Sequence, residues 1–180
     1  PVLPAIIDRG QADASVLAQV AIAKYVDHLP LYRQEAIYAR SGIALSRTTL
    51  AEWIGAVGVA LQPLADRLGE QLRQQPVLHA DETPVQLLDP GAGKTRRAYL
   101  FAYGNARHPG VGPPKVVFEF QSSRAGAHAR AFLGDWRGSL MVDEYAGYKA
   151  LWAEGVTELA CWAHARRKWF DQHKASGSAI

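Results

Sequence analysis

The hydrophobic pattern of this 180-residue sequence changes period at Pro76, and this change constrains the fold more than any other feature. Before Pro76 the apolar residues recur every three or four positions, as on one face of a helix. After Pro76, short runs rich in β-branched and aromatic residues alternate with turn residues and helical stretches. The sequence therefore predicts an all-helical block over residues 1–75, followed by an α/β domain over residues 76–180.

The helical block is predicted to contain three helices. Asp13 is a candidate N-cap of the first helix, Pro30 fits the first turn of the second, and Ser46 is a candidate N-cap of the third. Pro63 is expected to break or kink the third helix. That helix has the clearest apolar face, formed by Leu50, Trp53, Ile54, Val57, Gly58 and Leu61.

The segment 31–54 has the pattern of a helix-turn-helix, in which a short turn at residues 41–43 separates two helices. Arg47 and Thr48 open the second helix and are candidates for contact with DNA phosphates or base edges. The alternative is plain helical packing, because residues 1–75 carry seven basic and seven acidic side chains and include no basic recognition helix.

The α/β domain is predicted to contain five strands and three helices in the order β-β-β-α-β-α-β-α. Turn residues at Asp89-Pro90-Gly91 and at Pro109-Gly110 separate the first three strands. This order describes a mixed five-stranded sheet with flanking helices, as in ribonuclease H-like folds. The predicted strands are 77–81, 97–103, 115–120, 139–143 and 156–161, and the helices are 125–133, a short one ending near Trp152, and 162–173.

Composition narrows the class of protein. The chain has 48% hydrophobic and 21% charged residues, a composition typical of globular domains and not of disordered or fibrous chains. The longest apolar stretch is far shorter than the ~20 residues of a membrane span, and no leader opens the sequence. The single cysteine, Cys161, excludes an internal disulfide and indicates a reducing compartment. We therefore expect a cytoplasmic protein without membrane contact.

Two further observations concern partners and completeness. The excess of 20 basic over 17 acidic residues lies after residue 75, which suits a phosphate-rich partner, although a solvated basic surface is equally consistent. The only methionine is Met141, so a chain that begins at Pro1 is expected to be a fragment, a processed product or a trimmed piece.

Two aspartates are the last residues of predicted apolar strands, Asp81 of the first and Asp143 of the fourth. Two carboxylates that lie close together repel each other unless a cation separates them, and Mg²⁺ or Mn²⁺ suits such oxygen ligands. Paired divalent ions support phosphodiester chemistry. The alternative is that each aspartate merely caps the next turn or helix.

The last predicted helix carries aromatic and basic side chains. Cys161 and His164 have the spacing of half a zinc site, but no second pair matches, so structural roles are favoured. His79 and His128 are candidate bases without an identifiable partner, and structural roles are favoured for them too. The helix is predicted to have an aromatic packing side, formed by Trp162, Trp169 and Phe170. It is also predicted to have a basic side, suited to a nucleic-acid backbone and formed by Arg166, Arg167 and Lys168.

The α/β domain contains three motifs in fixed order, which are His79-Ala80-Asp81-Glu82-Thr83-Pro84, Asp143-Glu144-Tyr145-Ala146-Gly147-Tyr148 and Cys161-Trp162-Ala163-His164-Ala165-Arg166-Arg167-Lys168-Trp169-Phe170. These motifs resemble the transposases of bacterial insertion sequence 66. The segments 24–34 and 46–53 resemble the region that precedes the catalytic domain in that family. The similarity covers nearly the whole chain.

This resemblance implies a ribonuclease H-like core whose Asp, Asp and Glu residues hold two divalent ions, Mg²⁺ or Mn²⁺, and which cleaves transposon ends and joins them to target DNA. By position, Asp81 matches the first acid and Asp143 the second, so both are expected to be catalytic metal ligands. The implied partners are transposon-end and target DNA and further copies of the chain in an active homo-oligomer.

The sequence departs from the family pattern at two acids. Glu144 stands where the family usually has glycine, and it is not expected to be a ligand because the next side chain along a strand points to the opposite face. The family's third acid lies downstream of the last motif and is absent, since neither Glu154 nor Glu158 matches its position.

We therefore expect a transposase fragment that lacks both ends and is inactive or nearly so. The alternatives are a non-catalytic DNA-binding remnant and a ribonuclease H-like nuclease.

Overall fold

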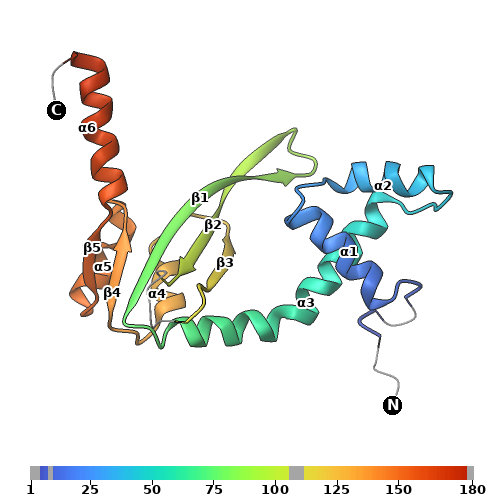
Figure 1. Ribbon diagram of the computed structural model, residues 1–180, viewed down its shortest axis with the longest axis horizontal. Coiled ribbons are helices and arrows are strands. Elements are labelled where there is room, and N and C mark those ends of the chain that lie inside the picture. The colour runs from blue at the N-terminus through green and yellow to red at the C-terminus, as the bar shows by residue number, and fades with distance from the viewer. Residues whose placement is uncertain (1–4, 8–9, 106–111, 178–180) are drawn as a thin grey trace. The chain divides into compact units, whose positions relative to one another are not determined.

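The computed structural model describes residues 5–7, 10–105 and 112–177, and it divides into two compact units, Pro1–Ala65 and Asp66–Ile180. The predicted α/β architecture is confirmed, because a helical block precedes a mixed five-stranded sheet with flanking helices (Figure 1). The turn predicted at Pro109-Gly110 lies outside the described residues. Within the described residues, no helix is long and apolar enough to cross a membrane.

The first unit contains helix α1 (Ala14–Tyr25), helix α2 (Leu31–Arg40) and the beginning of helix α3 (Arg47–Leu72). The two predicted side-chain caps are present: the Asp13 carboxylate accepts the Val16 N–H at 3.0 Å, and the Ser46 hydroxyl accepts the Thr49 N–H at 3.0 Å. Pro30 is the N-cap residue of α2 and lies just before its first turn. The core of this unit includes Leu17, Val20 and Leu50.

Helix α3 differs from the prediction at Pro63. The helix continues through this residue to Leu72, so of the two predicted effects, a break or a kink, the break is wrong. Proline removes a single backbone donor, and the good helix formers on both sides keep the remaining turns intact. The predicted apolar face is also only partly buried, because Leu50 is buried whereas Leu61 is 50% exposed.

The second unit is built on a sheet with the strand order β3-β2-β1-β4-β5. The first three strands form antiparallel hairpins, β4 runs parallel to β1, and β5 runs parallel to β4. This is the mixed five-stranded sheet that the element order predicted. The strands are β1 (Val77–Asp89), β2 (Lys94–Gly104), β3 (Val116–Gln121), β4 (Ser139–Val142) and β5 (Thr157–Ala160).

The helices of the second unit follow the predicted order. They are α4 (Ala127–Leu133), the 3₁₀ turn η1 (Ala146–Tyr148), α5 (Lys149–Ala153) and α6 (Trp162–Ser176). Strand β1 extends well beyond the predicted segment 77–81, because its second half pairs with β2 as far as the turn between Asp89 and Lys94. That turn occupies the position predicted from Asp89-Pro90-Gly91.

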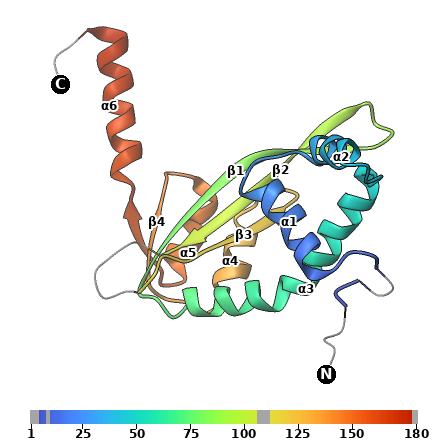
Figure 2. The ribbon, with the colours of Figure 1, turned by 45° about the vertical axis from the view of Figure 1, so that its right-hand side comes forward.

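The two faces of the sheet differ in burial. Helix α4 and the end of α3 lie on one face, which we call the closed face (Figure 2). Alternation along β1 directs Leu78, Ala80 and Glu82 into this face, where all three are buried. The other face, which we call the open face, carries exposed side chains, including Asp81 on β1 and Phe118 on β3.

Candidate functional site

The strand register brings Asp81 and Asp143 to the same level of the sheet. In the parallel pairing of β1 and β4, His79 is opposite Met141, and each aspartate lies two residues further along the chain, Asp81 within β1 and Asp143 directly after β4. Both aspartates line a single pocket of about 370 Å³ at this end of the sheet. The structure therefore brings together the two acids that the sequence singled out.

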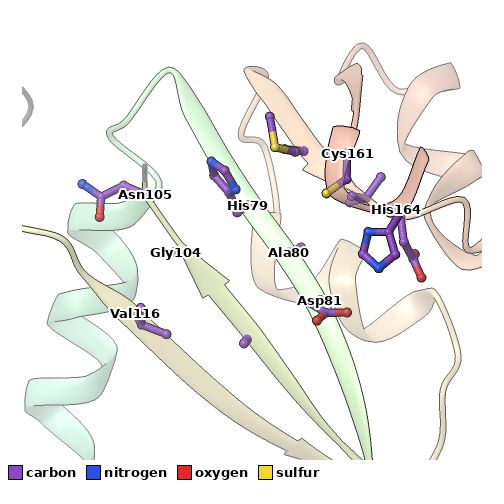
Figure 3. Close-up of a pocket in the computed structure, with 12 residues that line it drawn as sticks. His79, Ala80, Asp81, Gly104, Asn105, Val116, Cys161 and His164 are labelled. Atoms are coloured by element: carbon purple, nitrogen blue, oxygen red, sulfur yellow. The ribbon is translucent and has the colours of Figure 1, made fainter. Parts of the chain in front are cut away.

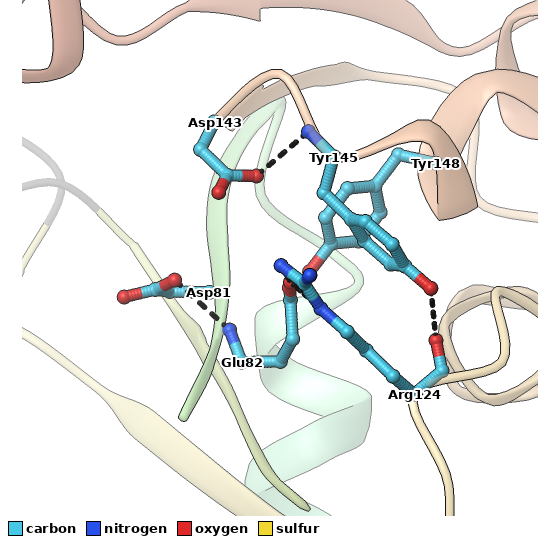
Figure 4. A network of polar contacts seen from close by, with 6 residues as sticks. All are labelled: Asp81, Glu82, Arg124, Asp143, Tyr145 and Tyr148. Carbon is cyan, nitrogen blue, oxygen red and sulfur yellow. Dashed lines mark hydrogen bonds and ion pairs between the residues drawn. The ribbon is translucent and has the colours of Figure 1, made fainter. Parts of the chain in front are cut away.

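Backbone N–H groups hold one oxygen of each carboxylate. The Glu82 N–H donates to Asp81 Oδ1 at 2.9 Å, and the Tyr145 N–H donates to Asp143 Oδ1 at 3.0 Å (Figure 4). The second bond spans a turn, so Asp143 also makes the capping contact that the alternative interpretation expects. Asp81 is exposed and Asp143 is half-buried, which leaves both carboxylates in contact with the pocket.

This donor set fits a divalent cation that prefers oxygen. Mg²⁺ in proteins is commonly held by one or two carboxylates, with water and substrate phosphate completing its shell, and Mn²⁺ accepts the same ligands. Asp81 and Asp143 would supply the protein ligands. Over the described ranges of the chain, however, no group of three or more His, Cys, Asp or Glu side chains is arranged to hold a metal ion.

Four further polar residues lie on the pocket wall: His79 from β1, Asn105 directly after β2, and Cys161 and His164 from the junction of β5 and α6 (Figure 3). The backbone N–H of His164, followed by its side chain, lowers the pKa of the Cys161 thiol. The Nδ1 atom of His164 is buried and has no hydrogen-bond partner among the described residues. Sequence reasoning favoured structural roles for His79, Cys161 and His164, although the shared edge of parallel strands could have placed Cys161 beside Asp143.

Glu82 is the residue near the site that sequence reasoning missed. It directly follows Asp81, but its side chain points to the closed face and is fully buried. A signal was available, because Glu82 continues the inward positions of Leu78 and Ala80. An acid at a core-facing position of a strand requires a buried partner.

The other acids considered in the sequence lie away from the pocket lining. Glu144 is exposed and forms an ion pair with Lys168. The hydrogen bond that the Lys168 ammonium donates to the Glu144 carboxylate lowers the pKa of Glu144. Glu154 Oε1 lies 3.9 Å from Arg130 Nε, and Glu158 is exposed on β5.

His128, the other candidate base, also lies away from the pocket lining. Its Nε2 is 2.8 Å from the Ser123 hydroxyl, and its ring packs edge-on against Phe101.

The candidate DNA contacts on α6 are exposed. Arg166 and Arg167 face solvent, whereas Lys168 is engaged by Glu144. The predicted aromatic packing side is not buried: Trp162 is 84% exposed, and no residue of α6 is buried. The helix leaves the sheet after the edge strand β5, so its aromatic side has no packing surface within the described part of this unit (Figure 1).

The candidate DNA contacts of the first unit lie in the first turn of α3. The side chains of Arg47 and Thr48 are exposed. The backbone N–H of Arg47 donates to the Glu35 carboxylate at 3.0 Å, which places an acid beside this helix start.

Comparison with known proteins identifies a matching family and two similar proteins. The family model described as Transposase IS66 family matches residues 9–180. The chain is 41% identical to the uncharacterized protein y4qI of Sinorhizobium fredii (strain NBRC 101917 / NGR234), over 93% of this chain and 33% of that protein. It is 40% identical to y4jD of the same strain, over 96% of this chain and 35% of that protein.

The chain spans about a third of the length of these curated relatives. The family match extends over the helical block and the sheet, including the pocket with Asp81 and Asp143. The chain therefore belongs to the IS66 transposase family.

Proposed function

We propose that this chain is the central part of a DNA transposase of the DDE type, in which Asp81 and Asp143 are the first two acids of the catalytic triad. The reaction would be metal-dependent cleavage at transposon ends, followed by transfer of the freed 3′ hydroxyl to a phosphodiester of target DNA. The single observation that carries the proposal is the β1–β4 register, which brings both carboxylates to one pocket.

A cation is needed at this site because of charge. Phosphodiester exchange places additional negative charge on oxygens of a substrate that is already anionic, and two carboxylates alone would repel it. When bound, Mg²⁺ or Mn²⁺ would neutralise this charge and lower the pKa of the attacking hydroxyl. The contribution of the chain is to fix the ligand oxygens: the pairing of β1 with β4 brings the two aspartates to one end of the sheet, and the two backbone N–H bonds orient them.

We further propose that the third acid of the triad lies outside these 180 residues. The described residues offer no third carboxylate in the pocket, and Glu154, the next acid after Glu144, lies beside Arg130 instead. On this proposal the chain by itself binds metal weakly and cleaves DNA poorly. The rival is a non-catalytic DNA-binding remnant, which the absence of a three-ligand cluster among the described residues favours.

The test is DNA cleavage by a version of the chain extended to supply the downstream acid. We expect Mn²⁺-dependent cleavage that Asp81→Asn and Asp143→Asn each reduce by about 10³-fold or more, because each removes charge from the ligand set. Glu144→Gln is the matched control, since this exposed acid neighbours Asp143 but pairs with Lys168. It should retain near-full activity.

The products separate the remaining alternatives. Joining of a 3′ end to target DNA supports a transposase, whereas cleavage without joining indicates a nuclease of the same fold. An extended protein that is folded but cuts no DNA would support the non-catalytic remnant and overturn the proposal.

We also propose that Arg166 and Arg167 contact the DNA backbone, with Lys168, Arg47 and Thr48 as further contacts. The support is their exposure together with the excess of basic residues after residue 75. Each phosphate contact that is removed should make the slope of log K against log salt less steep by about 0.9. Arg166→Ala/Arg167→Ala should therefore lower both affinity and slope in a filter-binding assay, and an unchanged slope would exclude the contact.

A further inference from the structure

The strongest unexplained feature near the pocket is the buried carboxylate of Glu82. Its side chain has no solvent exposure, and three donors from two other segments contact it. Arg124 donates to Oε1 from Nε at 2.8 Å and from Nη2 at 2.5 Å, and the Tyr148 hydroxyl donates to Oε2 at 2.6 Å (Figure 4). Both oxygens are thus satisfied, as a buried carboxylate requires.

The donors come from the two connections that flank the site. Arg124 belongs to the segment between β3 and α4, and Tyr148 belongs to η1 after β4. The Arg124 guanidinium also lies 3.8 Å from the ring centroid of Tyr145, whose hydroxyl donates to the Arg124 carbonyl. Glu82 therefore ties β1, the β3–α4 connection and the β4–η1 connection together. We call Glu82, Arg124, Tyr145 and Tyr148 the Glu82 network.

Close backbone approach reinforces this junction. A Cβ atom on Gly126 would lie 1.9 Å from the Gly147 carbonyl oxygen, so only glycine permits the two connections to meet. A Cβ atom on Gly147 would lie 2.2 Å from the ring of Tyr145. The two connections consequently have little freedom to shift relative to each other while the network is formed.

The network is linked directly to both aspartates through the backbone. Asp81 Oδ1 accepts the N–H of Glu82, and Asp143 Oδ1 accepts the N–H of Tyr145. Each candidate ligand therefore accepts a hydrogen bond from the backbone of a residue whose side chain belongs to the Glu82 network. Asp143 lies beyond the last residue of β4, so the strand pairing alone does not fix its position.

We propose that Glu82 is a positioning residue, which holds the connection after β4 against β1 and thereby sets Asp143 relative to Asp81. This inference deepens the proposed function and rests on it, because the positioning matters only if both aspartates serve one bound cation. Glu82 itself faces away from the pocket and is not a ligand. Its role is exerted through Arg124, Tyr145 and Tyr148.

The variant Tyr148→Phe tests this proposal with little change of shape, and the chain supplies a matched control. Tyr103 is buried in the same core, and its hydroxyl has no hydrogen-bond partner among the described residues. Tyr148→Phe removes a bond to Glu82, whereas Tyr103→Phe removes none. Glu82→Gln, which loses the charge that Arg124 pairs with, is a second variant of the network.

The first readout is amide hydrogen exchange in the metal-free 180-residue chain. We expect Tyr148→Phe and Glu82→Gln to accelerate exchange of the Tyr145 amide by about tenfold, since a hydrogen bond to a charged group is lost. The Phe101 amide of β2 should change less, and Tyr103→Phe should change neither. Equal acceleration at both amides, or none at Tyr145, would show that Glu82 is merely structural and would overturn the proposal.

The second readout is Mn²⁺ binding by calorimetry, which separates this proposal from the proposed function. Asp81→Ala and Asp143→Ala should abolish binding, while Tyr148→Phe should weaken it by about tenfold with both aspartates intact. Full-strength binding in Tyr148→Phe would overturn the positioning role alone. Binding that survives both aspartate substitutions would overturn the proposed metal site, even where the Tyr145 amide responds as expected.

Discussion

The open and closed faces of the sheet place acidic side chains in opposite environments. Asp81 and Glu82 are neighbouring acids on β1, yet Asp81 is exposed at the pocket whereas Glu82 is buried and fully paired. The pleat alone separates them, since successive side chains point to opposite faces. A carboxylate is thus available to a ligand only where donors of the fold have not already occupied both of its oxygens.

The largest expected difference between the faces concerns aromatic packing. Phe101 is fully buried on the closed face, so Phe101→Ala should lower the free energy of unfolding by about 3–5 kcal/mol. Phe118 is 62% exposed on the open face, and Phe118→Ala should cost less than about 1 kcal/mol. Urea denaturation, monitored at core amides of β2, measures the free energy of unfolding of both variants. Similar losses would contradict the assignment of a closed and an open face.

The second difference concerns the two neighbouring acids. Glu82→Ala leaves the Tyr148 hydroxyl and the Arg124 guanidinium without their acceptor, and it should lower the free energy of unfolding by about 2–4 kcal/mol. Asp81→Ala should change it by about 0.5 kcal/mol or less, because an exposed side chain is removed. The same denaturation experiment checks this, and a larger loss for Asp81→Ala would reverse the roles of the two acids.

The smallest effect is a pH dependence on the closed face. Burial raises the pKa of Glu119 on β3 above its ordinary value of 4.5, despite opposing contributions from Gln121, Arg73 and His128. The ionised carboxylate therefore destabilises the fold above its folded-state pKa, and this cost disappears as the pH falls below 4.5.

Glu119→Gln should consequently stabilise the chain at pH 7 by a few tenths of a kcal/mol, since solvent screens this half-buried group. The gain should vanish at low pH. Denaturation of both proteins at several pH values provides the measurement. A gain that persists in acid would assign the effect to packing and not to charge.

Much of the fold was predictable because its signals are local. The change of period at Pro76, the caps at Asp13 and Ser46, and the turn after Asp89 each depend on a few neighbouring residues, and all appear in the structure. Whether Pro63 would break α3 or leave it continuous was not predicted. It depends on the balance between one lost hydrogen bond and the many that remain, which sequence pattern does not measure.

The site was predictable only in part. The positions of Asp81 and Asp143 after apolar strands indicated that they would converge, and the register brings them to one pocket. The partners of Glu82 were not predictable, because Arg124 is 42 residues away in sequence and Tyr148 is 66. Such contacts depend on how connections pack after the sheet has formed, and no spacing rule encodes them.

The most direct test of the proposed metal site is calorimetric titration of the folded 180-residue chain with Mn²⁺, beside Asp81→Ala, Asp143→Ala and the control Glu144→Gln. We expect binding that either aspartate substitution abolishes and that Glu144→Gln leaves intact, because Glu144 pairs with Lys168 outside the ligand set. No binding by the folded chain, or binding that survives both aspartate substitutions, would contradict the claim that the two carboxylates form one metal site.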